Sequence, residues 1–195
     1  MRPAVKDLIN IAVFVVIYEA IRFVFGNLGA LTPVGQVLGP FFIPILTGIP
    51  FMLFLTRVKR FGLVTIFGVL FGLVVLALPG HSFYTLLFAI VLAPLADLIL
   101  RAGEFKRWPN MVACYIVIAE IGVAAVVPLF FLRDATIAAM RARKADDPGY
   151  VDTIIAMTPP WMFVGMIVMI AAGATIGAFL GRATLRKHFE RAGIA

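Results

Sequence analysis

The sequence predicts an all-α polytopic membrane protein, a single transmembrane domain of residues 1–195 built as a bundle of six helices. Two observations are compositional: 63% of the residues are hydrophobic and only 14% are charged, well below the quarter or so that is usual in soluble domains. The third is that the apolar residues form runs of about 20, the length that crosses a hydrocarbon core of roughly 30 Å. The alternation typical of barrel strands is absent, so helices are expected.

Six apolar segments meet this length, and polar, charged or Gly- and Pro-rich residues separate them. In chain order, the predicted helices cover residues 8–25, 34–55, 62–78, 83–100, 110–132 and 159–181. The one long connection, residues 133–158, is predicted to contain a short interfacial helix over Asp134–Ala145, followed by a break at Asp146–Gly149. This connection is either a lid over the bundle or a solvated linker.

The distribution of Lys and Arg predicts the orientation, because positive residues resist translocation. Basic residues cluster near both termini and in the connections after the second and fourth predicted helices. Residues 26–33 and 79–82 contain none, and those of residues 133–158 are balanced by aspartates. We therefore expect a plasma-membrane protein in the lipid bilayer with both termini in the cytoplasm. The net charge of +7 is attributed to this orientation, and no nucleic-acid partner is predicted.

Prolines interrupt the second predicted helix. Pro40, Pro44 and Pro50 each remove a backbone donor, so this helix is predicted to be kinked or broken. It is either the flexible wall of a pocket or a helix with ordinary membrane-helix kinks.

A stripe of small residues lies in the last predicted helix, where Gly173, Gly177 and Gly181 follow one another at four-residue spacing. Such a stripe allows helix backbones to approach closely. We expect it to serve packing within this bundle, with a partner's helices as the alternative.

Ionisable residues inside membrane helices are costly, so each is a candidate functional residue. Glu19 and Arg22 lie three residues apart and are expected to pair along one helix face, with a substrate contact as the alternative. Glu120 has no basic residue at its own level, so it is protonated, water-exposed or paired across the bundle, and it is a candidate ligand contact. The alternative is a neutral acid bonded to nearby backbone. Asp97 is expected to anchor the structure through basic residues near the inner end of its helix.

A substrate-binding site is predicted near the outer ends of the last three helices. Polar and aromatic side chains above apolar walls suit a small molecule with a flat or polar head. The candidate residues are His81, Tyr84, Glu120, Arg133, Asp134 and Trp161. The alternative is that Tyr84, Arg133 and Trp161 only anchor helix ends at the membrane interface.

Enzyme motifs are missing. The chain has no Gly-x-Ser-x-Gly elbow, no metalloprotease histidine spacing and no P-loop. Its two histidines, His81 and His188, fall on opposite predicted sides, and Cys114 is its single cysteine. No enzymatic activity, cofactor or metal site is therefore expected, and any energy for pumping must come from a partner or an ion gradient.

Several stretches spread over almost the whole chain carry a family resemblance. They are residues 48–62 (GIPFMLFLTRVKRFG), 80–81 (GH), 96–100 (ADLIL), 128–134 (PLFFLRD), 158–161 (TPPW), 180–182 (LGR) and 187–194 (KHFERAGI). In this order they resemble the Trep_Strep family of small bacterial membrane proteins, regarded as substrate-binding S components of energy-coupling-factor (ECF) transporters, a type of ABC transporter.

The resemblance implies a six-helix S component that binds a micronutrient from outside, and a vitamin-like or tetrapyrrole ligand is compatible with His81 and the aromatic residues. It also implies docking onto a transmembrane coupling protein driven by two ATPase subunits. The small-x-x-x-small pattern that many S components use for docking is reduced here to Ala12 and Ala20, with Val16 between them. A second hypothesis is a small intramembrane enzyme or membrane assembly factor that uses Glu120 or Asp97.

Overall fold

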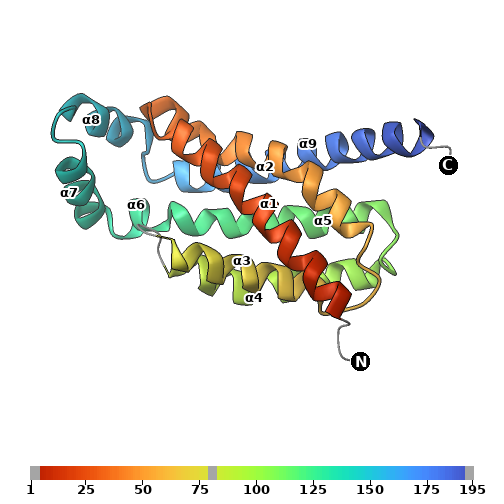
Figure 1. Ribbon diagram of the computed structural model, residues 1–195. Helices are drawn as coiled ribbons and strands as arrows, with labels where there is room; N and C mark the ends of the chain where they lie inside the picture. Colours follow the sequence, from red (N-terminus) through yellow and green to blue (C-terminus); the bar gives the residue numbers. More distant parts are fainter. Residues whose placement is uncertain (1–4, 79–82, 192–195) are drawn as a thin grey trace.

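The structure is a computed structural model that describes residues 5–78 and 83–191, and within these ranges every regular element is a helix. The all-helical class is confirmed. The long helices run side by side as a bundle, with α7 and α8 at one end, and the start of α1 and the end of α9 at the other (Figure 1).

Five helices in the described residues are long and apolar enough to cross a membrane. They are α1 (Val5–Gly29), α2 (Pro33–Leu55), α4 (Tyr84–Ala102), α5 continued by the 3-10 helix η1 (Trp108–Ala119 and Glu120–Ala125), and α9 (Met162–Arg191). The third predicted segment forms α3 (Leu63–Ala77), which is apolar but has only 15 residues. Because about 17 residues are needed to span the hydrocarbon, a sixth crossing stays a prediction.

Local sequence explains where α2 and α3 begin. Thr32 caps α2, because its hydroxyl accepts a hydrogen bond from the Gly35 N–H at 3.0 Å. The next residue, Pro33, is the first of the helix and has no N–H that would be left unpaired. α3 follows Gly62, whose φ of 100° favours glycine. The three prolines lie inside one continuous α2, so they do not break this helix.

α2 and α9 pack closely through the glycine stripe of α9. A Cβ atom added at Gly173, Gly177 or Gly181 would lie within 3.0 Å of backbone carbonyl oxygens of α2. Only glycine permits such an approach, so the stripe joins two helices of this chain.

The fifth predicted segment, residues 110–132, is divided into α5, η1 and α6 (Val127–Phe131) where a single helix was expected. Pro128 explains the division: it lacks an N–H, and its ring clashes with the carbonyl of Ala124, four residues earlier. The chain therefore leaves the α5 axis before it reaches the long connection.

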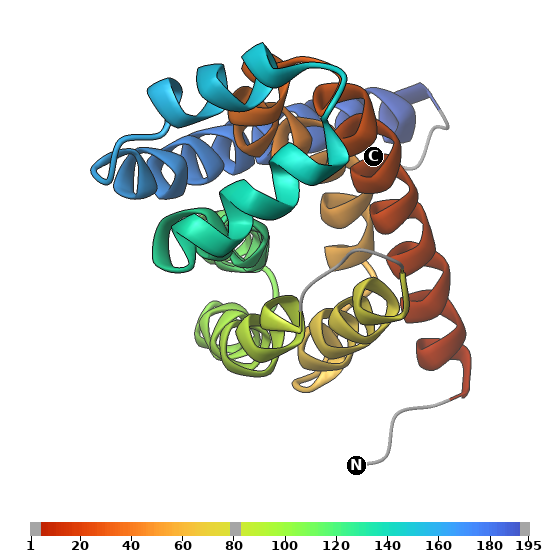
Figure 2. The same cartoon turned by 90° about the vertical axis from the view of Figure 1, so that its left-hand side faces the viewer.

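The long connection folds into two helices, α7 (Arg133–Arg143) and α8 (Pro148–Met157). The short helix expected over Asp134–Ala145 is confirmed as α7, whereas α8 was not predicted. Asp147 caps α8 by accepting the Tyr150 N–H at 3.1 Å. Figure 2 looks onto this end of the molecule and shows α7 crossing in front of the bundle, with α8 beside it.

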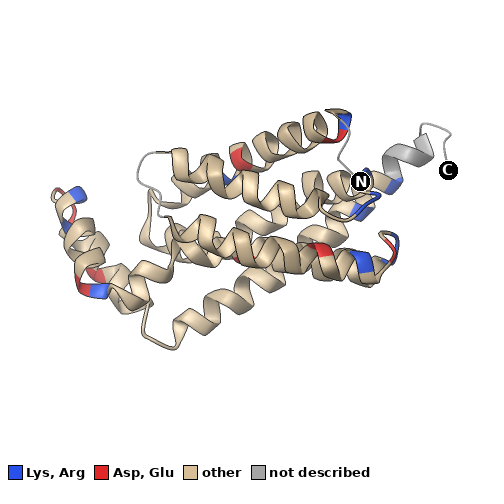
Figure 3. Cartoon of the chain, turned by 90° about the horizontal axis from the view of Figure 1, so that it is seen from below, with Lys and Arg blue, Asp and Glu red and all other residues tan. Residues whose placement is uncertain are grey.

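The bundle core is aromatic, and its outer surface is apolar. Tyr18 meets the rings of Phe67 and Phe71 edge-on, at centroid distances of 5.6 and 5.3 Å. Outward-facing apolar residues such as Val16 are exposed, as expected for helices covered by lipid. Charged residues gather at the two ends of the bundle (Figure 3), and the basic connections between α2 and α3 and between α4 and α5 lie opposite α7 and α8.

Candidate functional site

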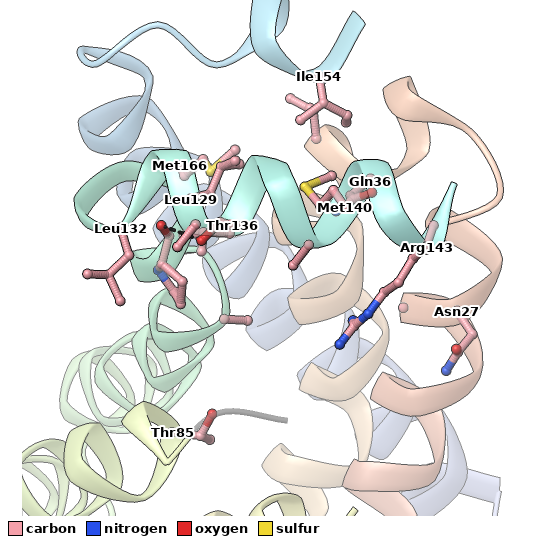
Figure 4. Close-up of a pocket in the computed structure, with 18 of the residues that line it drawn as sticks. Asn27, Gln36, Thr85, Leu129, Leu132, Thr136, Met140, Arg143, Ile154 and Met166 are labelled. Carbon is pink, nitrogen blue, oxygen red and sulfur yellow. Dashed lines mark hydrogen bonds between the residues drawn. The ribbon is translucent and has the colours of Figure 1, made fainter. Parts of the chain in front are cut away.

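A cavity of about 640 Å³ lies at the α7–α8 end of the bundle (Figure 4). Its walls come mainly from α1, α2, α6 and α7, with single residues from α4, α8 and α9. This volume falls within the roughly 300–1,000 Å³ of small-molecule sites in proteins. The end of the molecule predicted to bind substrate therefore contains a cavity of suitable size.

α7 forms the roof of this outer cavity. The α7 residues in the cavity wall recur at helical spacing, so one face of the helix points inward: Ala135, Thr136, Ala139, Met140 and Arg143. No residue of α7 is fully buried. Thr136 donates to the Pro128 carbonyl at 2.9 Å, which holds α7 against α6. Whether this roof opens as a lid stays a prediction.

A second cavity of about 210 Å³ lies deeper in the bundle. Its walls are largely apolar and include Tyr18, Phe71, Ile118 and Ile170. Five residues line both cavities, which places the two spaces next to each other: Arg22, Gly26, Gln36, Ala125 and Val126. The outer cavity therefore leads toward an apolar inner one.

Of the described residues that line the two cavities, the charged ones are Arg22 and Arg143. Arg22 makes the predicted pair with Glu19: its Nε and a terminal nitrogen each lie 2.6 Å from a carboxylate oxygen. This pair neutralises one edge of the guanidinium. Arg143 has no ionic partner among the described residues, and its side chain extends from α7 toward α1 and α2 (Figure 4).

Tyr150 fastens α8 to the turn between α1 and α2. Its hydroxyl lies 2.8 Å from the Ala30 carbonyl oxygen and is also hydrogen-bonded to Oε1 of Gln36. The Lys144 ammonium lies 4.5 Å from the centre of the tyrosine ring. Burial raises the pKa of Tyr150, and the carboxylate of Asp147 adds to this effect. The phenol therefore stays neutral and can donate throughout the physiological range.

Of the polar and aromatic residues predicted for the outer ends, those within the described ranges line neither cavity. Arg133 donates to the carbonyls of Thr158 and Ile155 at 2.8 and 3.2 Å and so joins the start of α7 to the end of α8. Asp134 is exposed in the first turn of α7, and Trp161 is 70% exposed. Tyr84 lies at the start of α4, and its ring stacks on Phe83. His81 lies outside the described residues.

The two carboxylates of the enzyme hypothesis line neither cavity, although Glu120 lies between two lining residues of the inner cavity, Ala119 and Gly122. Asp97 is fully buried, and its Oδ2 accepts from the backbone N–H groups of Gly62 and Thr65 and from the Thr65 hydroxyl, at 2.8–3.0 Å. Asp97 thus anchors the start of α3 as expected of a structural residue, but its partners are two backbone N–H groups and a hydroxyl, and not the basic residues that were predicted. One carboxylate oxygen of Glu120 is buried with no hydrogen-bond partner among the described residues.

The predicted docking residues Ala12 and Ala20 lie with Val16 on an exposed face of α1. Among residues 5–78 and 83–191, no group of three or more His, Cys, Asp or Glu side chains is placed to hold a metal ion.

Sequence comparison places the chain among membrane proteins. A family model described as a hypothetical bacterial integral membrane protein, Trep_Strep, matches residues 5–191. The chain belongs to this family. The family resemblance predicted from the sequence is therefore confirmed, and this Trep_Strep protein is an integral membrane protein with several apolar helices. No curated protein and no solved structure matches it.

Sequence reasoning missed most of the Trep_Strep cavity wall. Arg143, Gln36 and Asn27 were not singled out, because they lie far apart in the chain and belong to no known motif. One pattern was available: Ala135, Ala139 and Arg143 recur at four-residue spacing, which indicates one face of a helix.

Proposed function

We propose that the protein is the substrate-binding S component of an ECF-type micronutrient transporter. It captures a small molecule in the cavity beneath α7 and has no catalytic activity of its own. A transmembrane coupling protein and two ATPase subunits supply the energy, because the chain has no P-loop. The protein then lies in the plasma membrane with both termini in the cytoplasm.

The observation that carries the proposal is the position of the outer cavity. It lies at one end of the apolar bundle, opposite the connections that contain Arg57, Lys59 and Lys106 and the last turn of α4 with Arg101. Positive residues favour the cytoplasmic side, so the cavity faces the exterior. Ligand capture from outside, with ATP used by partners on the opposite side, is consistent with this arrangement.

Copurification tests the proposed partners. The full chain, tagged and extracted gently from its native membrane, is expected to retain a coupling protein and two ATPase subunits. Native mass spectrometry of the same sample would identify a retained small molecule. ATP-independent uptake into liposomes that contain the purified chain alone would contradict the proposal.

Cysteine labelling tests the orientation. Cys114 is the only cysteine and is buried, so an introduced surface cysteine can be labelled selectively. An impermeant maleimide applied to intact cells should label Asp146→Cys, in the α7–α8 turn. It should label Lys106→Cys, between α4 and α5, only after the membrane is permeabilised, and the unsubstituted chain is the control. The reverse pattern would put the cavity on the cytoplasmic side.

A further inference from the structure

The wall shared by the two cavities contains one charged group, the guanidinium of Arg22, which can only donate hydrogen bonds. The Glu19 carboxylate binds Nε and one terminal nitrogen of Arg22, which leaves the other terminal nitrogen, Nη1, on the edge away from Glu19. The Tyr150 hydroxyl has one hydrogen to share between the Ala30 carbonyl oxygen and the Gln36 side chain, so the Gln36 amide is engaged with Tyr150 and adds no charge to the wall. Such a wall suits a ligand group that accepts hydrogen bonds and donates none.

The charge balance of the cavities favours an anion. Glu19 compensates Arg22, whereas Arg143 has no counter-charge among the described residues, and none of the lining residues is acidic. Of the acidic residues near the roof, Asp152 pairs with Arg141 at 3.1 Å, Asp147 caps α8, and Asp134 and Asp146 are exposed and line neither cavity. A cationic ligand would meet two arginines and no carboxylate.

The inner cavity favours an apolar body. Beyond Gly26 and Gln36 its walls are formed by the rings of Tyr18 and Phe71, by isoleucines and by prolines of α2. A compact polar solute such as a sugar would lose its hydration there without gaining hydrogen bonds. The two adjoining cavities therefore differ in polarity along their length.

We propose that the two cavities together hold one elongated amphipathic anion. This ligand class rests on the proposed function. Its anionic head, of carboxylate type, lies between Arg143 and the free edge of Arg22, and its apolar body extends past Gly26 toward Tyr18 and Phe71. Arg143 contributes the charge, and the inner cavity contributes the apolar contact area.

A matched pair of probes tests this class. Pyrenebutyrate and pyrenebutanol share an aromatic body and differ in whether the head is a carboxylate or a hydroxyl. Binding to the full chain in phosphatidylcholine nanodiscs is measured by equilibrium dialysis, with empty nanodiscs as the reference for partitioning into lipid. We expect saturable binding of pyrenebutyrate, with pyrenebutanol at least about tenfold weaker, as for the loss of a charge-assisted hydrogen bond.

Two variants, each with a matched control, locate the probe. Arg143→Gln should weaken pyrenebutyrate about tenfold and leave pyrenebutanol unchanged. Arg141→Gln, on the same helix but outside the cavity wall, should change neither. Gly26→Leu should abolish binding of both probes, because its side chain fills the passage between the cavities. Gly26→Ala should retain binding, since its Cβ would lie 3.9 Å from the nearest atom, Cδ1 of Ile43.

Suppose that the two probes bind equally, and that their binding is unaffected by Arg143→Gln but lost in Gly26→Leu. This result would overturn the anionic class and leave the cavity as the capture site. Binding of neither probe, or binding that survives in folded Gly26→Leu, would overturn the inference, whereas copurification with ATPases would still support the transporter. Displacement of pyrenebutyrate by phosphatidylglycerol in the nanodisc would uphold the ligand class. It would also make the occupant a bilayer lipid and contradict the capture of a solute.

Discussion

The hydroxyl of Tyr150 on α8 is hydrogen-bonded to the side-chain oxygen of Gln36 on α2, although the two residues lie 114 positions apart. Gln36 lines both cavities, so this bond connects the α7–α8 segment directly to the cavity wall. The cavity wall and the α7–α8 segment therefore share a hydrogen bond that a substitution of Tyr150, which lines neither cavity, can remove.

Removing this hydroxyl should loosen α8. Tyr150→Phe keeps the buried ring but loses the bonds to Ala30 and Gln36, at a cost of about 1 kcal/mol. The expected result is faster trypsin cleavage after Lys144, in the α7–α8 turn, while the bundle stays folded by circular dichroism. Thr153→Val, which removes only the bond within α8 to Gly149, is the control. Cleavage of Tyr150→Phe at the control rate would contradict the role of the bond.

The same phenol should show an unusual titration. Burial, and then Asp147, raise the pKa of Tyr150 above its ordinary value of 10.0. Because the folded pKa exceeds the unfolded one, its contribution to stability is fully present below about pH 10 and is lost as the pH rises through the folded pKa. The difference in ultraviolet tyrosinate absorbance between the natural chain and Tyr150→Phe should rise above pH 10. A midpoint at or below 10 would refute the expected burial.

The glycine stripe of α9 should tolerate no side chain. A Cβ at Gly177 would approach backbone oxygens of α2 within 3.0 Å, so Gly177→Ala should lower the free energy of unfolding by about 2 kcal/mol. Gly122→Ala is the control, because its Cβ would meet only Cδ1 of Ile170, at 3.9 Å. Thermal melting in detergent measures both. If the two variants melted alike, the close contact of α2 with α9 would be wrong.

Asp97 should behave as a structural residue. Asp97→Ala removes three hydrogen bonds at the start of α3 and should cost about 3 kcal/mol of stability. Thr65→Val removes one of the three and should cost about 1 kcal/mol. Both should bind pyrenebutyrate as the natural chain does, at temperatures where they remain folded. Loss of binding in the folded variants would give Asp97 a direct role at the site.

Hydropathy predicted the membrane class and the long helices, because the cost of burying polar backbone in lipid forces continuous apolar runs. It could not predict the division at Pro128 or the presence of α8. The α8 sequence, Pro148–Met157, is too short to span a membrane, and its fit against the α1–α2 turn depends on Tyr150 contacting Gln36 across the fold. Such long-range contacts leave no periodic pattern.

The cavity was harder to predict than the helices. Charge patterning predicted which end of the bundle faces the exterior, and this orientation stays a prediction, whereas the Glu19–Arg22 pair that helical spacing predicted is confirmed. Conspicuous residues such as Arg133 and Trp161 were expected to contact the substrate, yet the structure uses Arg133 on backbone carbonyls and leaves Trp161 exposed. The side chains that do converge, Arg22, Gln36 and Arg143, come from three helices, and their convergence depends on tertiary packing.

The contrast between the glycine contact of α2 with α9 and the roof formed by α7 bears on how a bound molecule leaves. Interlocked backbones resist deformation, so the α2–α9 contact is stiff, whereas the roof has no fully buried side chain and is predicted to open as a lid. Entry and exit then involve the displacement of one short peripheral segment, while the hydrophobic interior stays intact. On this prediction, a bound molecule enters and leaves while the packing of the long helices stays unchanged.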